Sequence, residues 1–277
     1  LELNFYCDTY GIDTISAGGS ISFVMECYER GLIDNEVTGG LELTFGNADA
    51  ALELLHQMAR GEGFGVVVGQ GSRALKRIFA DNYGLDYDFL NQIGMESKGM
   101  EISEYITKEA VAQQAGYGLS SKGAQHDESL LVMQDKVRNQ MPALEQKAKA
   151  LSYYPILRTW FSLHGMCKLI WNDITPESNK TATDPNEFPE HIENYTWLYE
   201  GVTGNKATKE DFIAQSARVY HFQRVFNLRL GFGTRKYDYM PYRAVGPVSE
   251  EEYLSKESFY DTELTNKWDI DITKMDL

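Results

Sequence analysis

The sequence has few cysteines, no block of basic residues and no long apolar run, and each shortage excludes a class of protein. Its three cysteines, Cys7, Cys27 and Cys167, are far apart and odd in number, so we expect no disulfide framework and a reducing cytoplasm. None has C-x-x-C spacing, so a four-cysteine iron–sulfur cluster would need ligands from outside this sequence. The longest apolar stretch, residues 64–68, is far shorter than the roughly 20 residues of a membrane span.

Positive charge is also scarce, because 26 Lys and Arg face 41 Asp and Glu and leave a net charge of −15 at pH 7. Binding to a phosphate backbone relies on clustered Lys and Arg, so we expect no nucleic acid partner. An acidic surface instead suits solubility or small cationic carriers. Hydrophobic residues make up 43% of the chain, which is ordinary for a folded globular protein.

Helical spacing recurs along the chain, whereas the period-two alternation of strands is scarce. Ile21, Val24, Met25 and Tyr28 follow the i, i+3, i+4, i+7 pattern, and Gly31 is a stop signal, so Asp13-Thr14 should precede a helix. A further helix is expected after the cap Asn47, with Ala51, Leu52, Leu55 and Met58 facing inward. Helices are also expected over residues 72–82, 128–140 and 143–160, and Pro142 would lie at the first turn of the last of these. A long helix should begin at the capping box of Thr208 and Asp211 and continue through Phe226.

These patterns predict a mostly α-helical protein with two helical domains, residues 1–98 and 99–277. The boundary near Lys98-Gly99 is indicated by the glycine and by a change of pattern. Because Leu1 opens the sequence without Met and already inside a patterned segment, we also expect a further N-terminal part.

Two short segments share one pattern, Asp8-Thr9-Tyr10-Gly11-Ile12-Asp13-Thr14 and Ser162-Leu163-His164-Gly165-Met166-Cys167-Lys168. Each has a polar residue, two further residues, Gly, an aliphatic residue, and then Asp or Cys. A carboxylate there can accept hydrogen bonds from a flat heterocycle, and the Gly lets the backbone approach the ring. A thiolate beside the ring can bind iron. Taken singly, each has a simpler interpretation, since Asp is a common helix cap and a lone Cys is more often a buried hydrophobe.

The repeated pattern D-x-x-G-(I/L/M)-(D/C) resembles the two pterin-binding turns of the tungsten-containing aldehyde ferredoxin oxidoreductases, whose second turn ends in a cysteine ligand of a [4Fe–4S] cluster. Ser162 departs from the pattern, because the second turn of the family starts with Asp. The following segments resemble, in order, blocks of the C-terminal two domains of this family: Asp13-Thr14-Ile15-Ser16, Tyr28-Glu29-Arg30-Gly31, Arg60-Gly61-Glu62-Gly63, Lys98-Gly99-Met100-Glu101, Val202-Thr203-Gly204, Arg224-Val225-Phe226-Asn227, and Arg235-Lys236-Tyr237-Asp238 with Pro241.

The resemblance implies that residues 1–98 are similar to the C-terminal part of domain 2 and residues 99–277 to domain 3. It implies a tungsten or molybdenum bis-pterin cofactor, oxidation of an aldehyde to a carboxylic acid, and electron transfer through a [4Fe–4S] cluster to ferredoxin or an iron–sulfur subunit. An anaerobic, cytoplasmic homo- or hetero-oligomer would be expected. The implied residues are Asp8, Gly11, Ile12, Asp13 and Thr14 for one pterin, Ser162, Gly165 and Met166 for the other, and Cys167 for the cluster.

One histidine matches a further feature of the family. His126 lies in Lys122-Gly123-Ala124-Gln125-His126-Asp127, where the resemblance implies a G-x-x-H segment whose histidine donates a proton to substrate. An imidazole suits this role because its pKa falls near working pH. The simpler interpretation is a helix-start histidine beside Asp127. His56 and His164 are interpreted as structural.

Other functions stay open at this point. The segments Glu101-Ile102-Ser103-Glu104-Tyr105, Gly123-Ala124-Gln125-His126-Asp127-Glu128 and Cys167-Lys168-Leu169-Ile170-Trp171-Asn172-Asp173 look closer to the branch of the family that reduces aromatic acyl-CoA thioesters, the benzoyl-CoA reductase type. A non-catalytic helical subunit without metal is a further alternative, because Ser162 replaces an acid and partner cysteines are lacking.

A dinucleotide-binding turn is a rival interpretation of the segment from Val66 to Ala74. The apolar residues 66–68 precede Gly69-Gln70-Gly71-Ser72-Arg73-Ala74, which matches G-x-G-x-x-A. Against it, Asp81, Asp86 and Asp88 fall in a loop pattern rather than at the end of a second strand. A glycine-rich helix entry is the preferred interpretation.

Overall fold

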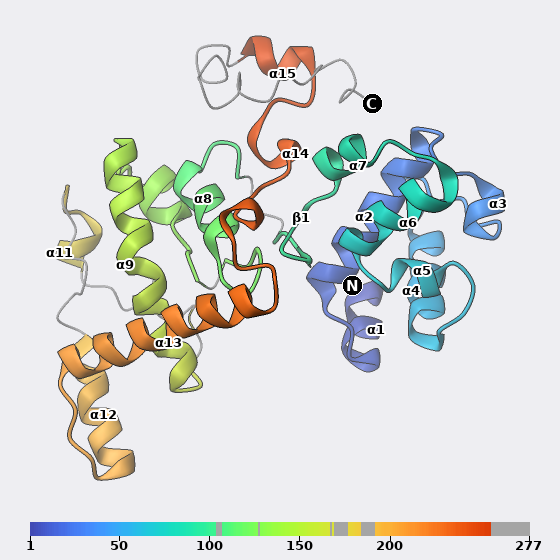
Figure 1. Cartoon of the computed structure of the whole chain (residues 1–277). Helices are drawn as coiled ribbons and strands as arrows, with labels where there is room; N and C mark the ends of the chain where they lie inside the picture. The colour runs from blue at the N-terminus through green and yellow to red at the C-terminus, as the bar shows by residue number, and fades with distance from the viewer. Residues whose placement is uncertain (104–106, 127, 167, 169–176, 184–191, 256–277) are drawn as a thin grey trace. The chain divides into compact units, whose positions relative to one another are not determined.

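The computed structural model describes residues 1–103, 107–126, 128–166, 168, 177–183 and 192–255. It is mostly helical, with one two-stranded hairpin among the described residues, and this confirms the expected fold class (Figure 1). Its contacts divide it into two compact units, unit 1 with the described residues of 1–105 and 240–277, and unit 2 with those of 106–239. The domain limits expected at residues 98 and 99 stay a prediction; these two residues form the turn of the hairpin.

Unit 1 is built from short helices that begin and end at strong local signals. Side-chain oxygens of Asp13, Asp34, Asn47 and Asp86 accept amide hydrogen bonds at the first turns of four of them. The elements of unit 1 are α1 (Glu2–Tyr10), α2 (Thr14–Glu29), α3 (Asn35–Thr38), α4 (Ala48–Arg60), α5 (Gly65–Val68), α6 (Ser72–Tyr83), α7 (Tyr87–Ile93), β1 (Glu96–Ser97), β2 (Met100–Glu101), α14 (Tyr242–Val245) and α15 (Glu250–Ser255).

The core of unit 1 is apolar and includes one buried ion pair. Val24 of α2, Leu54 of α4 and Phe79 of α6 are fully buried in it. Lys76, also fully buried, donates from Nζ to Glu96 Oε1 at 2.6 Å, which ties α6 to β1. Burial lowers the pKa of Lys76 from its usual value, because the charged form loses hydration.

Unit 2 centres on two long helices. α13 packs on α9, and Trp160 of α9 lies 5.3 Å, between ring centroids, from Phe212 of α13. The α13 start is the expected capping box, in which Thr208 and Asp211 exchange hydrogen bonds. The elements of unit 2 are α8 (Val111–Leu119), the π-helix η1 (Met133–Val137), α9 (Leu144–Leu163), α11 (Glu177–Lys180), α12 (Glu193–Thr203), α13 (Lys209–Arg229) and the 3₁₀ helix η3 (Arg235–Tyr237).

Several local predictions are wrong. The helix expected over residues 128–140 is only the short η1, because Gln113 Oε1 accepts the amide protons of Leu131 and Val132 and so holds this segment in another conformation. Pro142 precedes α9 instead of opening it. In α4 Ala51 and Leu55 are buried as predicted, but Leu54, fully buried, takes the inward position expected for Leu52.

None of the described helices is long and apolar enough to cross a membrane. The segment of residues 172–190, rich in Pro, Asn, Thr and Asp, lies outside the described residues apart from 177–183.

Candidate functional site

The first of the two matching turns connects α1 to α2. α1 ends at Gly11, whose φ of 69° is the left-handed conformation that glycine adopts without strain. The amide of Gly11 donates to the Asp8 carbonyl at 3.4 Å and that of Ile12 to the Cys7 carbonyl at 2.9 Å, the hydrogen-bond pattern of a Schellman motif. Asp13 then caps α2, since its Oδ2 accepts from the amide of Ser16 at 2.8 Å.

The second turn repeats this backbone at the end of α9. Gly165 has a φ of 65°, and its amide donates to the Ser162 carbonyl at 3.2 Å. The amide of Met166 donates to the Phe161 carbonyl at 3.0 Å. The two backbone hydrogen bonds of the first turn therefore have counterparts at the same positions of the second.

The side chains of the two turns are also arranged alike. Ile12 packs on the cluster of Cys7, Ala17 and Leu55, and Met166 packs on a cluster that contains Phe161, so each aliphatic residue anchors its turn to the helix it ends.

The outer surface of each turn is open. At both glycines a Cβ atom would meet no heavy atom within 4 Å, and the polar residues that start the motifs, Asp8 and Ser162, are exposed. Each turn thus presents bare backbone beside an exposed oxygen, which fits a flat heterocycle lying on the glycine.

Cys167, the predicted cluster ligand, lies outside the described residues. The residue that follows it is held firmly, because the fully buried Arg158 of α9 donates from Nη1 to the Lys168 carbonyl at 2.7 Å. The other cysteines are poor ligands: Cys7 and Cys27 are buried, and burial raises the pKa of both thiols. Within the described ranges, no group of three or more His, Cys, Asp or Glu side chains could hold a metal ion.

His126 lies half-buried in a loop of unit 2, residues 120–126, which follows α8. The amide of Gln125 donates to the Gly123 carbonyl at 2.8 Å, and Gly123 has a φ of 111°. His126 is therefore not at a helix start, which was the simpler interpretation. The second turn belongs to the same unit as His126, and the first turn belongs to unit 1.

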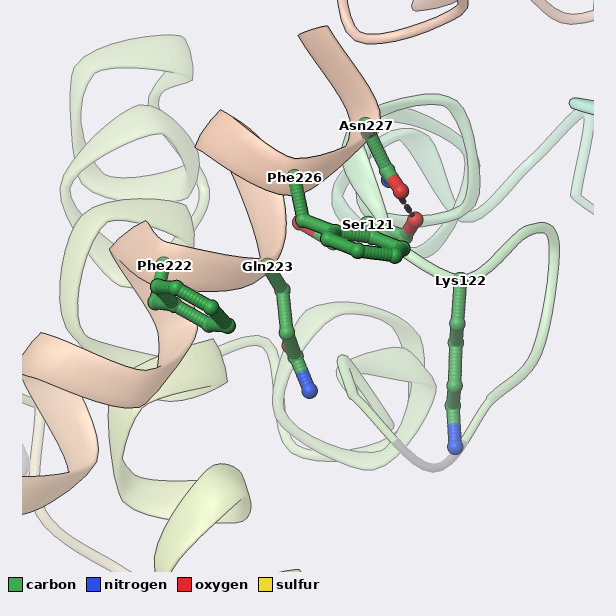
Figure 2. Close-up of a pocket in the computed structure, with 6 residues that line it drawn as sticks. All are labelled: Ser121, Lys122, Phe222, Gln223, Phe226 and Asn227. Carbon is green, nitrogen blue, oxygen red and sulfur yellow. Dashed lines mark hydrogen bonds between the residues drawn. The ribbon is translucent and has the colours of Figure 1, made fainter. Parts of the chain in front are cut away.

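A pocket of about 270 Å³ lies between this loop and α13 (Figure 2). Phe222 and Phe226 border it although they are 66% and 53% exposed, so these aromatic residues of α13 are not part of the core. The remaining lining residues are Ser121, Lys122, Gln223 and Asn227.

Two histidines have the structural roles that were predicted. His56 Nδ1 lies 2.8 Å from the Tyr10 hydroxyl and links α4 to the end of α1. His164 Nδ1 lies 2.9 Å from the Trp160 carbonyl, and its ring packs against Phe212.

The rival dinucleotide turn is contradicted by two observations. Residues 65–68 form the helix α5 rather than a strand. The amide of Ser72, at the start of α6, donates to Glu101 Oε1 at 2.7 Å, so a carboxylate from β2 occupies the position that a phosphate would need. The preferred interpretation, a glycine-rich helix entry, is confirmed.

Comparisons with known proteins identify the family to which the chain belongs. Residues 1–267 match the family model described as aldehyde ferredoxin oxidoreductase, domains 2 and 3. The tungsten-containing aldehyde ferredoxin oxidoreductases of Pyrococcus horikoshii and Pyrococcus furiosus are 26% and 25% identical over 251 and 249 residues. The alignments cover 88% of this chain and 37% of each relative.

A third relative has another described activity. The aliphatic sulfonate oxidoreductase, WOR-like subunit, of Pyrococcus furiosus is 25% identical over 126 residues, 45% of this chain and 20% of the relative.

The chain belongs to the aldehyde ferredoxin oxidoreductase family and corresponds to its domains 2 and 3. It spans 37% of the length of the two tungsten-containing relatives named above.

Proposed function

We propose that this chain provides the two pterin-binding turns of an oxidoreductase that converts an aldehyde to a carboxylic acid. The observation that carries the proposal is that the repeated sequence motif forms the same turn at Gly11 and at Gly165, with an exposed Asp8 or Ser162 beside an open glycine. The pair of backbone hydrogen bonds alone would not carry it, because the same pair also ends helices at Gly31, Gly61 and Gly231. Two equivalent cradles are what a metal held between two similar heterocycles requires.

In this proposal Asp8 and Asp13 hold one pterin. The exposed Asp8 carboxylate accepts hydrogen bonds from ring and amino N–H groups. Asp13 already accepts the Ser16 amide through Oδ2, which leaves its second oxygen to accept from the ligand, while Gly11, Ile12 and Thr14 complete the turn.

The second pterin lies on Gly165 and Met166. Ser162 replaces the acid of the family pattern, and its hydroxyl can both donate and accept. A neutral hydroxyl forms weaker hydrogen bonds to N–H groups than a carboxylate does, so this side binds its ring less strongly.

The reaction consumes an aldehyde and a water molecule and yields a carboxylic acid, two protons and two electrons. When bound, the tungsten- or molybdenum-pterin group would take up the electrons, which pass through a [4Fe–4S] cluster to ferredoxin. His126 holds or releases a proton on an imidazole nitrogen at the substrate. Cys167 supplies one thiolate to the cluster, and the other three ligands come from outside this sequence.

Partners and setting follow from the same proposal. The acidic chain works in an anaerobic cytoplasm with the remaining part of the enzyme, in a homo- or hetero-oligomer. It passes electrons to ferredoxin or to an iron–sulfur subunit.

Substitution of Asp8 tests the proposal at the first turn. In the complete enzyme purified without oxygen, Asp8→Ala should lower pterin content, measured by fluorescence after oxidative release, and tungsten or molybdenum content by about 10-fold or more, since orienting groups of a metal site typically contribute 10–100-fold. Asp81→Ala is the matched control, because Asp81 is an exposed acid of α6. Equal pterin and metal in both variants would refute the role of Asp8.

A second candidate substrate is an aromatic acyl-CoA thioester, reduced rather than oxidised. The residues around His126 and Cys167 favour it, because they look closer to the benzoyl-CoA reductase branch. Two assays distinguish these substrates: oxidation of an aldehyde with benzyl viologen as electron acceptor, and reduction of benzoyl-CoA with a reduced dye as electron donor. Turnover of neither substrate, with no metal in the complete assembly, would favour a non-catalytic helical subunit.

A further inference from the structure

We propose that Asn227 of α13 is a positioning residue for His126, and that it acts by fixing loop 120–126. This inference rests on the proposed function of His126. It gives a role to the segments Arg224–Asn227 and Arg235–Asp238, which resemble blocks of the family and have no part in the proposed chemistry.

Glu128 closes the loop at its base. Glu128 Oε2 accepts from the Ser120 hydroxyl at 2.8 Å and from the Ser121 amide at 3.1 Å, and Glu128 is 4% exposed. One carboxylate after the loop therefore holds the two residues that begin it. A charged acceptor in a buried site gives strong hydrogen bonds, so the ends of the loop stay together.

Asn227 attaches the closed loop to α13. Its side-chain amide donates to the Ser121 carbonyl, and both residues are buried (Figure 2). The pocket beside this contact shows that side-chain packing does not fill the space between the loop and α13. The position of the loop on the helix thus depends on the hydrogen bond of Asn227.

The end of α13 that carries Asn227 is itself fixed. Arg224 donates to both carboxylate oxygens of Asp238, at 2.7 and 2.6 Å, a two-bond geometry that restricts rotation. The chain returns to make this contact through Gly233, where a Cβ atom would lie 2.4 Å from the Leu228 amide nitrogen. Only a glycine allows that approach.

These contacts form one path from the Arg224–Asp238 pair to His126. The Arg224–Asp238 pair fixes the last turns of α13. Asn227, in these turns, holds Ser121 through its hydrogen bond, and His126 lies five residues after Ser121 in the same loop. A group that exchanges protons with substrate must be placed to within a fraction of an ångström, so loosening the loop should lower turnover without weakening substrate binding.

The test compares variants of the complete enzyme by hydrogen–deuterium exchange and steady-state kinetics. Asn227→Asp keeps the shape of the side chain but removes the donor. We expect amides of residues 120–126 to exchange about 10-fold faster or more, with α9 unchanged, because only the local opening is affected. We expect kcat to fall about 10- to 100-fold with KM nearly constant.

Two further variants accompany Asn227→Asp. Val225→Ala, on the same helix and 49% exposed, should leave loop exchange and kcat unchanged. Asp238→Asn weakens the two-bond pair with Arg224 that fixes the end of α13 and should give a smaller change of the same kind, so the proposal stays testable if Asn227→Asp does not fold.

The outcomes distinguish positioning from chemistry. Loop exchange and kcat at the wild-type level in Asn227→Asp, or in Asp238→Asn when the first does not fold, would overturn the positioning proposal. Faster exchange throughout unit 2 would also overturn it, since that marks general destabilisation. If His126→Gln keeps full activity while Asn227→Asp still speeds exchange of the loop alone, the proton role of His126 is wrong and the hold of Asn227 on the loop is upheld.

Discussion

At the scale of single residues, the two turns depend on glycines in the left-handed conformation. Gly11 and Gly165 have φ values of 69° and 65°, and space is open around both. The sequence pattern was enough to pair these turns, because a Schellman motif is local and its glycine is visible in the sequence. Asn227 could not be assigned a role in this way, since its partner Ser121 is 106 positions away.

Alanine at either glycine should destabilise its unit by a similar amount. A left-handed L-residue costs roughly 1–2 kcal/mol, and no steric clash adds to this at either site. Thermal unfolding of Gly11→Ala and Gly165→Ala measures the effect. Gly18→Ala in α2 and Gly201→Ala in α12 are matched controls without a positive φ, and they should be neutral or stabilising by up to about 1 kcal/mol. Controls that lose as much as the turn variants would contradict the conformational argument.

At the scale of elements, helices with local end signals were predicted well. α4 begins after Asn47 and α13 begins with Thr208 and Asp211, as expected. The prediction of a helix over residues 128–140 failed because the amides of Leu131 and Val132 are satisfied by the side chain of Gln113 of α8. This is a tertiary effect that periodicity does not reveal. The hairpin was also not predicted, because Glu96 and Glu101 hold it to α6 through contacts that a local sequence pattern does not reveal.

The buried pair of Lys76 and Glu96 should be costly to break from one side. Lys76→Met leaves the Glu96 carboxylate without its cation and Glu96→Gln leaves a buried ammonium, so each should destabilise unit 1 by about 3–5 kcal/mol. The double variant Lys76→Met, Glu96→Gln should lose less than either single one. Urea unfolding of all three gives the coupling. If the loss of unfolding free energy in the double variant equals the sum of the two single losses, the two residues act independently.

At the scale of the whole molecule, the family and the helical architecture agree with what the ordered motifs indicated. The chain corresponds to domains 2 and 3, and it spans 37% of the length of its tungsten-containing relatives. The two turns belong to different compact units, one at the end of α1 and one at the end of α9.

The most direct test of the two-turn account is the composition of the complete enzyme, purified without oxygen. Elemental analysis and pterin release should give two pterins for each tungsten or molybdenum ion, together with iron. Protein that contains neither metal nor pterin, or a single pterin per metal, would contradict the claim that both turns hold the cofactor.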